Sequence, residues 1–399
     1  MDKQIKTGRA FLKGDMGIWI IFILLMLISL VEVYSAIGNE AYTIDKSTFG
    51  LFIKHFITIA FSFVCIYTCS QISYTKISKF LAPLLLISIG LLIFVLIIHK
   101  RWIPIPGFGA FQPSEMAKYI LVLYMARELV LLKDRLKTKE AFIRIIIPVG
   151  IVCGLIIPQS ATAAGITFLS CFLLMIIAGM RKKYLINLAL IVGISLTIAF
   201  TLTSKYPEQM KNIPGMDRIT EGYERIFPQE LNIQVKNARL ALGTAGVMGK
   251  GIGNSQLANF QPEAHNDYIY TIILEEGGFL FGFVVMLLYM ILLYRCFMIA
   301  KKSKGMFGAF IAIGVGLVII IQSLINMFVG SGFRIVTGQT LPFISKGGTS
   351  YMFACIALGV VLNISSQGEK KESYDEDMEE VNENSSLDNL IQTKEEENR

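Results

Sequence analysis

Residues 261–278 read QPEAHNDYIYTIILEEGG and join a polar segment to a long apolar run. His265, Asp267 and the adjacent pair Glu275 and Glu276 lie near the start of that run. Charged groups this close to hydrocarbon are energetically expensive, so where they occur they usually serve a function. This stretch therefore predicts a membrane helix that begins beside a chemically active site.

Similar apolar runs recur along the whole chain, in which 54% of the 399 residues are apolar and only 17% are charged. A helix needs about 20 apolar residues to cross a bilayer, and helices satisfy their own backbone hydrogen bonds there. Runs of about this length lie near 17–37, 50–70, 80–99, 114–132, 142–158, 161–180, 184–203, 268–295, 306–329 and 342–365. We therefore expect an all-α polytopic membrane protein with ten transmembrane helices in a domain covering 17–365. A long extracytoplasmic loop, 204–267, would separate helices 7 and 8.

Basic residues gather in the connections on one side of this arrangement. They precede the first run and follow runs 2, 4, 6 and 8. The positive-inside rule places that side, and both chain termini, in the cytoplasm. The first run is long enough to span and lacks a small-residue cleavage site, so we expect an anchor behind a cytoplasmic segment, 1–16.

The remaining composition narrows the class of protein further. From Glu369 onward the chain carries twelve acidic and four basic residues, a net charge of −8, which leaves +15 for the rest. We expect the tail, 366–399, to be disordered in the cytoplasm. The positive excess of the core lies mostly in the orienting loops, so nucleic-acid binding is not indicated. All six cysteines fall inside apolar runs, and neither a disulfide framework nor a zinc motif is visible.

The first unusual outward segment is 100–118, KRWIPIPGFGAFQPSEMAK. Arg101 stands at an interface, where basic and aromatic side chains are common anchors. Pro113 suits the first turn of a helix, and Glu115 and Lys118 are three residues apart on one helical face, where they can pair. The pair is either a capping carboxylate with a snorkelling lysine or a charged wall suited to an anionic lipid headgroup. In the second reading, Lys118→Ala weakens donor binding more than it perturbs folding.

The second and third segments are rich in glycine. GVMGKGIGNSQ, 246–256, lies in the long loop and predicts tight turns, a hinge or close approach to a ligand, but it does not match a nucleotide-binding loop. RIVTGQTLPFISKGGTS, 334–350, carries Pro342 and a Gly-Gly pair that predict a broken or re-entrant backbone buried in protein, although a simple interfacial turn is the alternative. Lys346 beside the glycines can offer positive charge to an oxyanion.

All these segments share the predicted outer side. A cavity there would bring together Arg101, Glu115, Lys118, His265, Asp267, Glu275 and Lys346. That mixture of charges suits a phosphate-bearing polar lipid better than a simple ion.

Four motifs, QPSEMAK (112–118), GVMGKGIGNSQ (246–256), PEAHNDYIYTIILEEGG (262–278) and TGQTLPFISKGGTS (337–350), resemble those of the SEDS family, which includes FtsW, RodA and SpoVE. The resemblance covers about residues 15–365, and the motifs look closer to the division member, FtsW. It implies a ten-helix glycosyltransferase of the bacterial cytoplasmic (inner) membrane that polymerises lipid II into peptidoglycan. It also implies a class B penicillin-binding protein as the cross-linking partner, together with other divisome or elongasome proteins.

The resemblance implies roles for single residues as well. The essential aspartate of the family falls on Asp267, and its glutamate and lysine fall on Glu115 and Lys118. HNDYIY stands where the family usually has HTDFIF. Gln159 stands where an acidic signature is common, so that site lacks its carboxylate. Arg239 is also unusual for the family.

The expected mechanism follows from these roles. Asp267 would act as general base on the acceptor hydroxyl, unless it is only the N-cap of span 8. Arg101, Lys118 and Lys346 would stabilise the pyrophosphate leaving group, while His265 and Glu275 would line the substrate site. A divalent cation, Mg²⁺ or Mn²⁺, could bridge Asp267 or Glu115 to phosphate, and no organic cofactor is expected. The alternatives are a lipid II flippase or other transporter, and a non-catalytic scaffold that activates the penicillin-binding protein.

Overall fold

The computed structural model describes residues 12–37, 48–105, 109–206, 233–261, 264–333 and 337–368. The predicted N-terminal segment and the loop at 204–267 are therefore described only in part. The predicted acidic tail lies outside the described residues beyond Gly368.

A helix forms within each of the ten predicted apolar runs, although the tenth begins at Thr349 and not near 342, because residues 342–348 belong to a non-helical turn. These helices are α2 (Met16–Ala36), α4 (Thr48–Gln71), α6 (Leu81–Ile97), α7 (Pro113–Leu131), α8 (Lys139–Ile156), α9 (Ala161–Ile177), α10 (Lys182–Lys205), α16 (Ile269–Lys302), α17 (Met306–Gly330) and a last helix at Thr349–Gly368. Seven helices of the described chain are long and apolar enough to cross a membrane. Helix α9 is apolar but shorter, and α7 and α8 carry several charged residues, so membrane crossing by these three stays a prediction.

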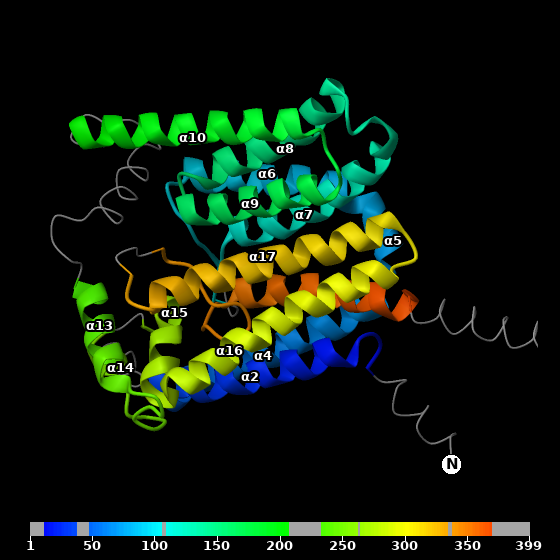
Figure 1. Ribbon diagram of the computed structural model, residues 1–399. Coiled ribbons are helices and arrows are strands. Elements are labelled where there is room, and N and C mark those ends of the chain that lie inside the picture. Colours follow the sequence, from blue (N-terminus) through cyan, green and yellow to red (C-terminus); the bar gives the residue numbers. More distant parts are fainter. Residues whose placement is uncertain are drawn as a thin grey trace, which may run out of the picture.

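Shorter elements lie at the two ends of the bundle. At one end, α5 (Tyr74–Ile77) and η1 (Ser78–Phe80) lead into α6, and η2 (Lys133–Arg135) follows α7. At the opposite end, within the predicted long loop, lie α13 (Ile233–Ala245), α14 (Gln256–Phe260) and α15 (Ala264–Asp267) (Figure 1). We call the end that carries α13–α15 the predicted outer end.

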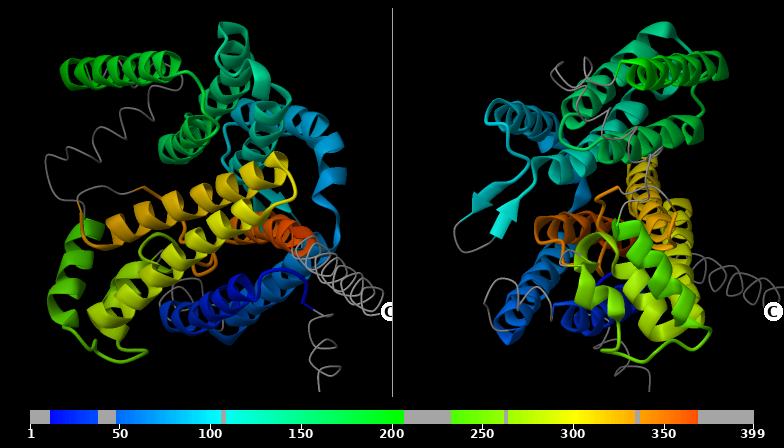
Figure 2. Two further views of the ribbon diagram at one scale, coloured as in Figure 1. Left: turned by 45° about the vertical axis from the view of Figure 1, so that its right-hand side comes forward. Right: turned by 90° about the vertical axis from the view of Figure 1, so that its left-hand side faces the viewer.

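The all-helical fold carries one small β element that the sequence did not predict. Strands β1 (Ile103–Ile105) and β2 (Gly109–Phe111) form an antiparallel hairpin between α6 and α7. Each strand is only three residues long, too short for the alternating pattern by which strands are found in a sequence. The hairpin projects from the bundle just before α7 begins (Figure 2).

The core of the bundle forms around α17 and the last helix, which are mostly buried, whereas α10 is almost entirely exposed. Figures 1 and 2 show α10 at the margin of the bundle. Close packing of α17 depends on small residues. A Cβ on Gly314 would lie 2.5 Å from Val122 of α7, and one on Gly316 would lie 2.9 Å from Cys296 of α16. Such contacts let membrane helices approach one another closely.

Helix α16 is broken at Gly278, where φ is 77° and ψ is 175°. This backbone conformation is essentially restricted to glycine. The break ends a first half that carries Glu275 and Glu276 and starts a second half at Phe279. A broken helix leaves carbonyl groups unpaired before the break and N–H groups unpaired after it.

The glycine segment, residues 246–251, fills this break with its own backbone. The N–H groups of Lys250 and Gly251 donate to the carbonyl groups of Glu275 and Glu276, each at 2.9 Å, and the N–H groups of Phe279 and Leu280 donate to the carbonyl groups of Gly246 and Val247, each at 3.3 Å. A Cβ on Gly249 would lie 2.2 Å from the carbonyl oxygen of Glu276, and one on Gly278 would lie 2.2 Å from that of Val247. The two segments therefore interlock, and the glycines permit the contact.

Candidate active site

The centre of the candidate site is the 337–348 turn, which connects α17 to the last helix without regular structure. Leu341, Phe343 and Ile344 in this turn are almost fully buried. Irregular backbone survives at membrane depth only where protein groups satisfy it. The turn is thus the predicted broken backbone buried in protein and not a simple interfacial turn, while a re-entrant course in the membrane stays a prediction.

Side chains from α17 and α16 satisfy the carbonyl groups of the turn. Gln322 donates from Nε2 to the Thr340 carbonyl at 2.9 Å, and Asn326 donates from Nδ2 to the Gln339 carbonyl at 2.6 Å. The hydroxyl of Tyr289, on α16, donates to the Pro342 carbonyl. The turn is thus held by groups on two rigid helices.

The turn also stores backbone strain at Phe343, whose φ is 64°. Positive φ is an outlier for a bulky residue and persists only when its surroundings enforce it. The ring of Phe343 packs edge-on against Phe22 at 5.6 Å and Tyr351 at 6.1 Å between centroids. These contacts hold the residue in place and fix the turn around it.

Glu115 and Lys118 form a buried ion pair at the start of α7. Pro113 occupies the first turn of α7, as predicted. Both charged residues are buried, with Glu115 4% exposed and Lys118 0% exposed. Lys118 Nζ lies 3.1 Å and 3.0 Å from the two carboxylate oxygens of Glu115. It also donates to Oε1 of Gln322 at 2.6 Å. All three protons of the ammonium group are therefore used within the protein.

This pair is joined to the 337–348 turn and to the helix that follows it. Ser350 donates from Oγ to Glu115 Oε2 at 2.8 Å, and the hydroxyls of Ser350 and Thr340 lie 3.1 Å apart. Gln322 contacts both Lys118 and Thr340, so one amide bridges the pair and the turn. Motifs more than 200 residues apart in sequence thus form one hydrogen-bonded network.

Asp267 ends the short helix α15 and faces the same turn. Its carbonyl accepts from Asn326 Nδ2 at 3.1 Å, and a Cβ on Gly338 would lie 3.7 Å from Asp267 Oδ2. The residue is half-buried. The N-cap of α16 is Tyr268, so Asp267 does not hold the capping position that was its alternative role. A partly accessible carboxylate beside a glycine leaves room for a polar substrate.

His265 and Lys346 lie where α15 crosses the turn. The N–H of Lys346 donates to the His265 carbonyl at 3.3 Å, and Ser345 Oγ donates to the Asn266 carbonyl at 2.7 Å. His265 is buried, whereas Lys346 is half-exposed. These bonds bring the two predicted substrate residues to the same place as Asp267.

Two further predicted site residues lie on other segments of the chain. Arg101 is half-exposed and precedes β1 by two residues. Its hairpin reaches the site through Thr349, whose hydroxyl donates to the Ala110 carbonyl at 3.2 Å and accepts from the Gln112 N–H at 3.3 Å.

Glu275 is fully buried and bound by its own chain. It accepts from Lys250 Nζ at 2.6 Å, from Ser255 Oγ at 2.7 Å, and from the N–H groups of Gln256 and Leu257 at 3.0 Å and 3.2 Å. Its carboxylate therefore binds residues 250–257 to α16 through these hydrogen bonds. A role in substrate binding stays a prediction for this residue.

Polar residues that the sequence reasoning did not assign complete the site. Gln322 and Asn326 lie four residues apart in an otherwise apolar run, a spacing that places them on one helical face. His55 of α4 lies 2.9 Å from the Ser29 hydroxyl, which donates to the Ile344 carbonyl at 2.6 Å. Buried polar groups in membrane helices are the signal that could have identified these residues.

The described residues include no group of three or more His, Cys, Asp or Glu side chains arranged to hold a metal ion. Glu115 already accepts from Lys118 and Ser350, which leaves little capacity for a cation. Asp267, half-buried at the edge of the turn, is the more accessible of the two predicted ligands. A cation there would need further oxygen ligands from a substrate phosphate or from water.

The chain is similar to known proteins along most of its length. A family model described as cell cycle protein, for FtsW, RodA and SpoVE, matches residues 15–370. A protein of Geobacter sp. (strain M18) named "Probable peptidoglycan glycosyltransferase FtsW" is 29% identical over 367 residues, which cover 88% of this chain and 97% of the relative. Stage V sporulation protein E of Bacillus subtilis is 32% identical over 374 residues, which cover 88% and 96%.

Solved structures share the fold. A chain from the work "Structural coordination of polymerization and crosslinking by a peptidoglycan synthase complex" has a TM-score of 0.70 at 20% identity and covers 89% of this chain and 98% of its own length. The rod shape determining protein RodA of Thermus thermophilus has a TM-score of 0.62 at 19% identity, with 89% and 98% coverage. Since the family model spans most of the sequence and the relatives match along almost their full length, this chain belongs to the SEDS family of FtsW, RodA and SpoVE proteins.

Proposed function

We propose that this chain is a peptidoglycan glycosyltransferase that polymerises lipid II into β-1,4-linked glycan strands, for septal or elongation wall synthesis. Family membership and the names of its curated relatives support the proposal. The observation that carries it is the position of Asp267 at the 337–348 turn, in one network with the buried pair Glu115 and Lys118.

In the proposed reaction, Asp267 accepts the proton of the 4-hydroxyl of the acceptor lipid II. The hydroxyl oxygen then attacks C1 of the donor sugar, and the bond from C1 to the pyrophosphate oxygen breaks as the pyrophosphate leaves with the electron pair. An alcohol is a weak nucleophile, so a positioned carboxylate assists as the new bond forms. In-line attack inverts the anomeric centre and gives a β linkage from an α-linked donor.

The leaving pyrophosphate requires positive charge close to the reacting atoms. Lys346 is the best-placed candidate, because it is half-exposed and its backbone is bonded to the helix that carries Asp267. Arg101, before the hairpin, is a second candidate. Lys118 is better suited to positioning, since its three protons are bound to Glu115 and Gln322. If Mg²⁺ or Mn²⁺ takes part, it would be held by Asp267 together with substrate phosphate oxygens.

The proposed topology has ten spans with both termini in the cytoplasm. The basic connections after α4, α7, α9 and α16 lie at the end of the bundle opposite α13–α15 (Figure 1). The positive-inside rule then assigns the end that holds Asp267 to the outer face of the membrane. There the enzyme would meet lipid II and a class B penicillin-binding protein that cross-links the nascent strands, with other divisome or elongasome proteins nearby.

The test is polymerisation of purified lipid II by the full chain, alone and with its penicillin-binding partner carrying an inactivated transpeptidase serine. Glycan ladders on a gel support the proposal. Absence of ladders in both conditions contradicts it. A parallel assay of fluorescent lipid II translocation across vesicles then separates a flippase, which moves the lipid, from a scaffold, which does neither.

A further inference from the structure

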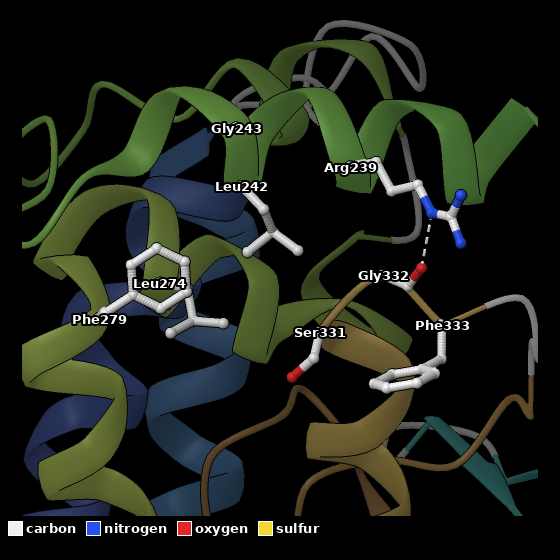
Figure 3. A pocket seen from close by; sticks show the side chains of 8 residues that line it. All are labelled: Arg239, Leu242, Gly243, Leu274, Phe279, Ser331, Gly332 and Phe333. Carbon is white, nitrogen blue, oxygen red and sulfur yellow. Dashed lines mark hydrogen bonds between the residues drawn. The ribbon is translucent and has the colours of Figure 1, made fainter.

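A pocket lies at the predicted outer end, between α13, the break in α16 and the end of α17 (Figure 3). Its volume is about 490 Å³, within the range of about 300–1,000 Å³ that is typical of ligand sites. None of the residues that line it belongs to the network around Asp267. This pocket therefore needs an explanation of its own.

The pocket combines one cation with apolar walls. Leu242, Leu274, Phe279 and Phe333 supply the apolar surface, and Arg239 stands at the rim (Figure 3). Phe279 and Phe333 are each 50% exposed although they are large and apolar. Exposed aromatic surface of this kind is consistent with contact to lipid or to another apolar partner.

Arg239 is fixed in place by its backbone neighbour. Its Nε donates to the Gly332 carbonyl at 2.8 Å, and its terminal nitrogens extend beyond this bond, above Phe333 (Figure 3). Gly332 has a φ of 79°, and a Cβ there would lie 3.1 Å from Cγ of Arg239 and 3.2 Å from Cδ1 of Leu242. Glycine at position 332 therefore allows α13 to pack closely against the end of α17, and the Gly332 carbonyl orients the guanidinium group.

Below the pocket the apolar surface continues along the bundle. Phe279, Phe283 and Leu287 are spaced four residues apart on one face of α16, and all are exposed. On α17, Phe328 is exposed and stacks on Phe333 with 3.9 Å between ring centroids. An alkyl chain that enters the pocket can thus follow these side chains toward the membrane centre.

We infer that this pocket binds an anionic glycerophospholipid, with the headgroup phosphate at Arg239 and one acyl chain along Phe279 and Phe333. A guanidinium group forms paired hydrogen bonds to phosphate oxygens. Lys236, exposed one turn earlier on α13, adds positive charge on the same side of the helix. The positive charge of Arg239 matches the phosphate of such a lipid, and the exposed apolar side chains of α16 and α17 match its acyl chain.

The test is a lipid titration of the full-length protein followed by native mass spectrometry. The probes are phosphatidylglycerol, phosphatidylcholine and a polyprenyl phosphate. Arg239→Gln removes the charge, and we expect the affinity for phosphatidylglycerol to fall about fivefold, the effect of one basic group at a membrane surface. Lys205→Gln, at the exposed end of α10, removes an equal charge elsewhere and should leave the affinity unchanged.

A second variant tests the cavity itself. Gly243 lines the pocket on α13, and a Cβ there would meet no atom within 4 Å, so Gly243→Leu can fill the space without a clash at the backbone. Leucine also favours a helix more than glycine does, so the variant should stay folded. We expect it to lose the tightest phosphatidylglycerol site while its thermal unfolding temperature is maintained.

Three results would overturn the inference. Wild-type affinity for phosphatidylglycerol in both Arg239→Gln and Gly243→Leu would show that lipid binds elsewhere. Equal binding of phosphatidylcholine and phosphatidylglycerol by the wild type would remove the role of charge. Stronger retention of polyprenyl phosphate than of phosphatidylglycerol would assign the pocket to an isoprenoid lipid instead.

Discussion

The interlock between the glycine segment and the break in α16 can be tested by adding single methyl groups. Gly278→Ala places a Cβ in a backbone conformation that costs about 1–3 kcal/mol for any other residue. That Cβ would also lie 2.2 Å from the Val247 carbonyl oxygen, so the glycine segment must move away. Loss of two of the four backbone hydrogen bonds adds about 1–3 kcal/mol, at about 0.5–1.5 kcal/mol each. We therefore expect the free energy that holds the glycine segment in the break of α16 to fall by about 2–6 kcal/mol.

The assay is hydrogen exchange read by mass spectrometry, because the bonded N–H groups belong to Lys250, Gly251, Phe279 and Leu280. A loss of about 2 kcal/mol or more corresponds to exchange at least about 25-fold faster in the peptides that contain them. Gly249→Ala, which would also bring a Cβ within 2.2 Å of backbone, should behave in the same way.

Two control glycines separate contact from backbone strain. Gly246 has a φ of 66° but open space around its Cβ position, so Gly246→Ala should show only the strain of about 1–2 kcal/mol. Gly243 lies inside α13 with open space, and Gly243→Ala should stabilise the helix by about 0.5–1 kcal/mol. Exchange in Gly278→Ala and Gly249→Ala no faster than in Gly246→Ala would refute the interlock as described.

Three further predictions concern the network around the turn. Lys118→Ala leaves Glu115 buried without its partner, so thermal unfolding should reveal a loss of about 3–5 kcal/mol, whereas replacing both residues by leucine-sized apolar side chains should restore most of it. Asn326→Leu removes the amide that joins Asp267 to the turn, and glycan polymerisation should slow by about 100-fold with little change in lipid II affinity, measured by equilibrium binding. If Asp267 holds a divalent cation, a chelator should abolish polymerisation and added Mg²⁺ or Mn²⁺ should restore it, whereas full activity in the chelator would exclude an exchangeable cation.

The positions of the helices followed from the sequence because apolar runs of membrane length are a local signal. A helix forms within each of the ten predicted runs, and Pro113 and the Gly347-Gly348 pair mark a helix start and a non-helical turn as expected. Helix α13 lies within the predicted loop, although its buried residues Val235, Ala238 and Ala241 recur every three positions. That pattern of small residues signals a helix packed on a surface, and attention to it would have found α13.

The long-range contacts could not be predicted from local patterns. The bond between Lys118 and Gln322 joins residues that are 204 positions apart, and it changes the expected role of the lysine. The sequence predicts that Lys118→Ala weakens donor binding more than it perturbs folding. A fully buried ammonium group bound to Glu115 and Gln322 instead predicts that folding stability suffers more. Likewise, Gly249 approaches the backbone of α16 so closely that a Cβ would clash, a contact between distant segments that only the fold reveals.

The central claim is that Asp267 removes the proton from the acceptor hydroxyl. The most direct measurement is lipid II polymerisation by Asp267→Asn beside the wild type, with Glu140→Gln, an exposed carboxylate on α8, as the matched control. We expect folded Asp267→Asn to bind lipid II but to form no glycan ladder, while Glu140→Gln polymerises lipid II at the wild-type rate. Ladders of equal length and rate from Asp267→Asn and the wild type would contradict it.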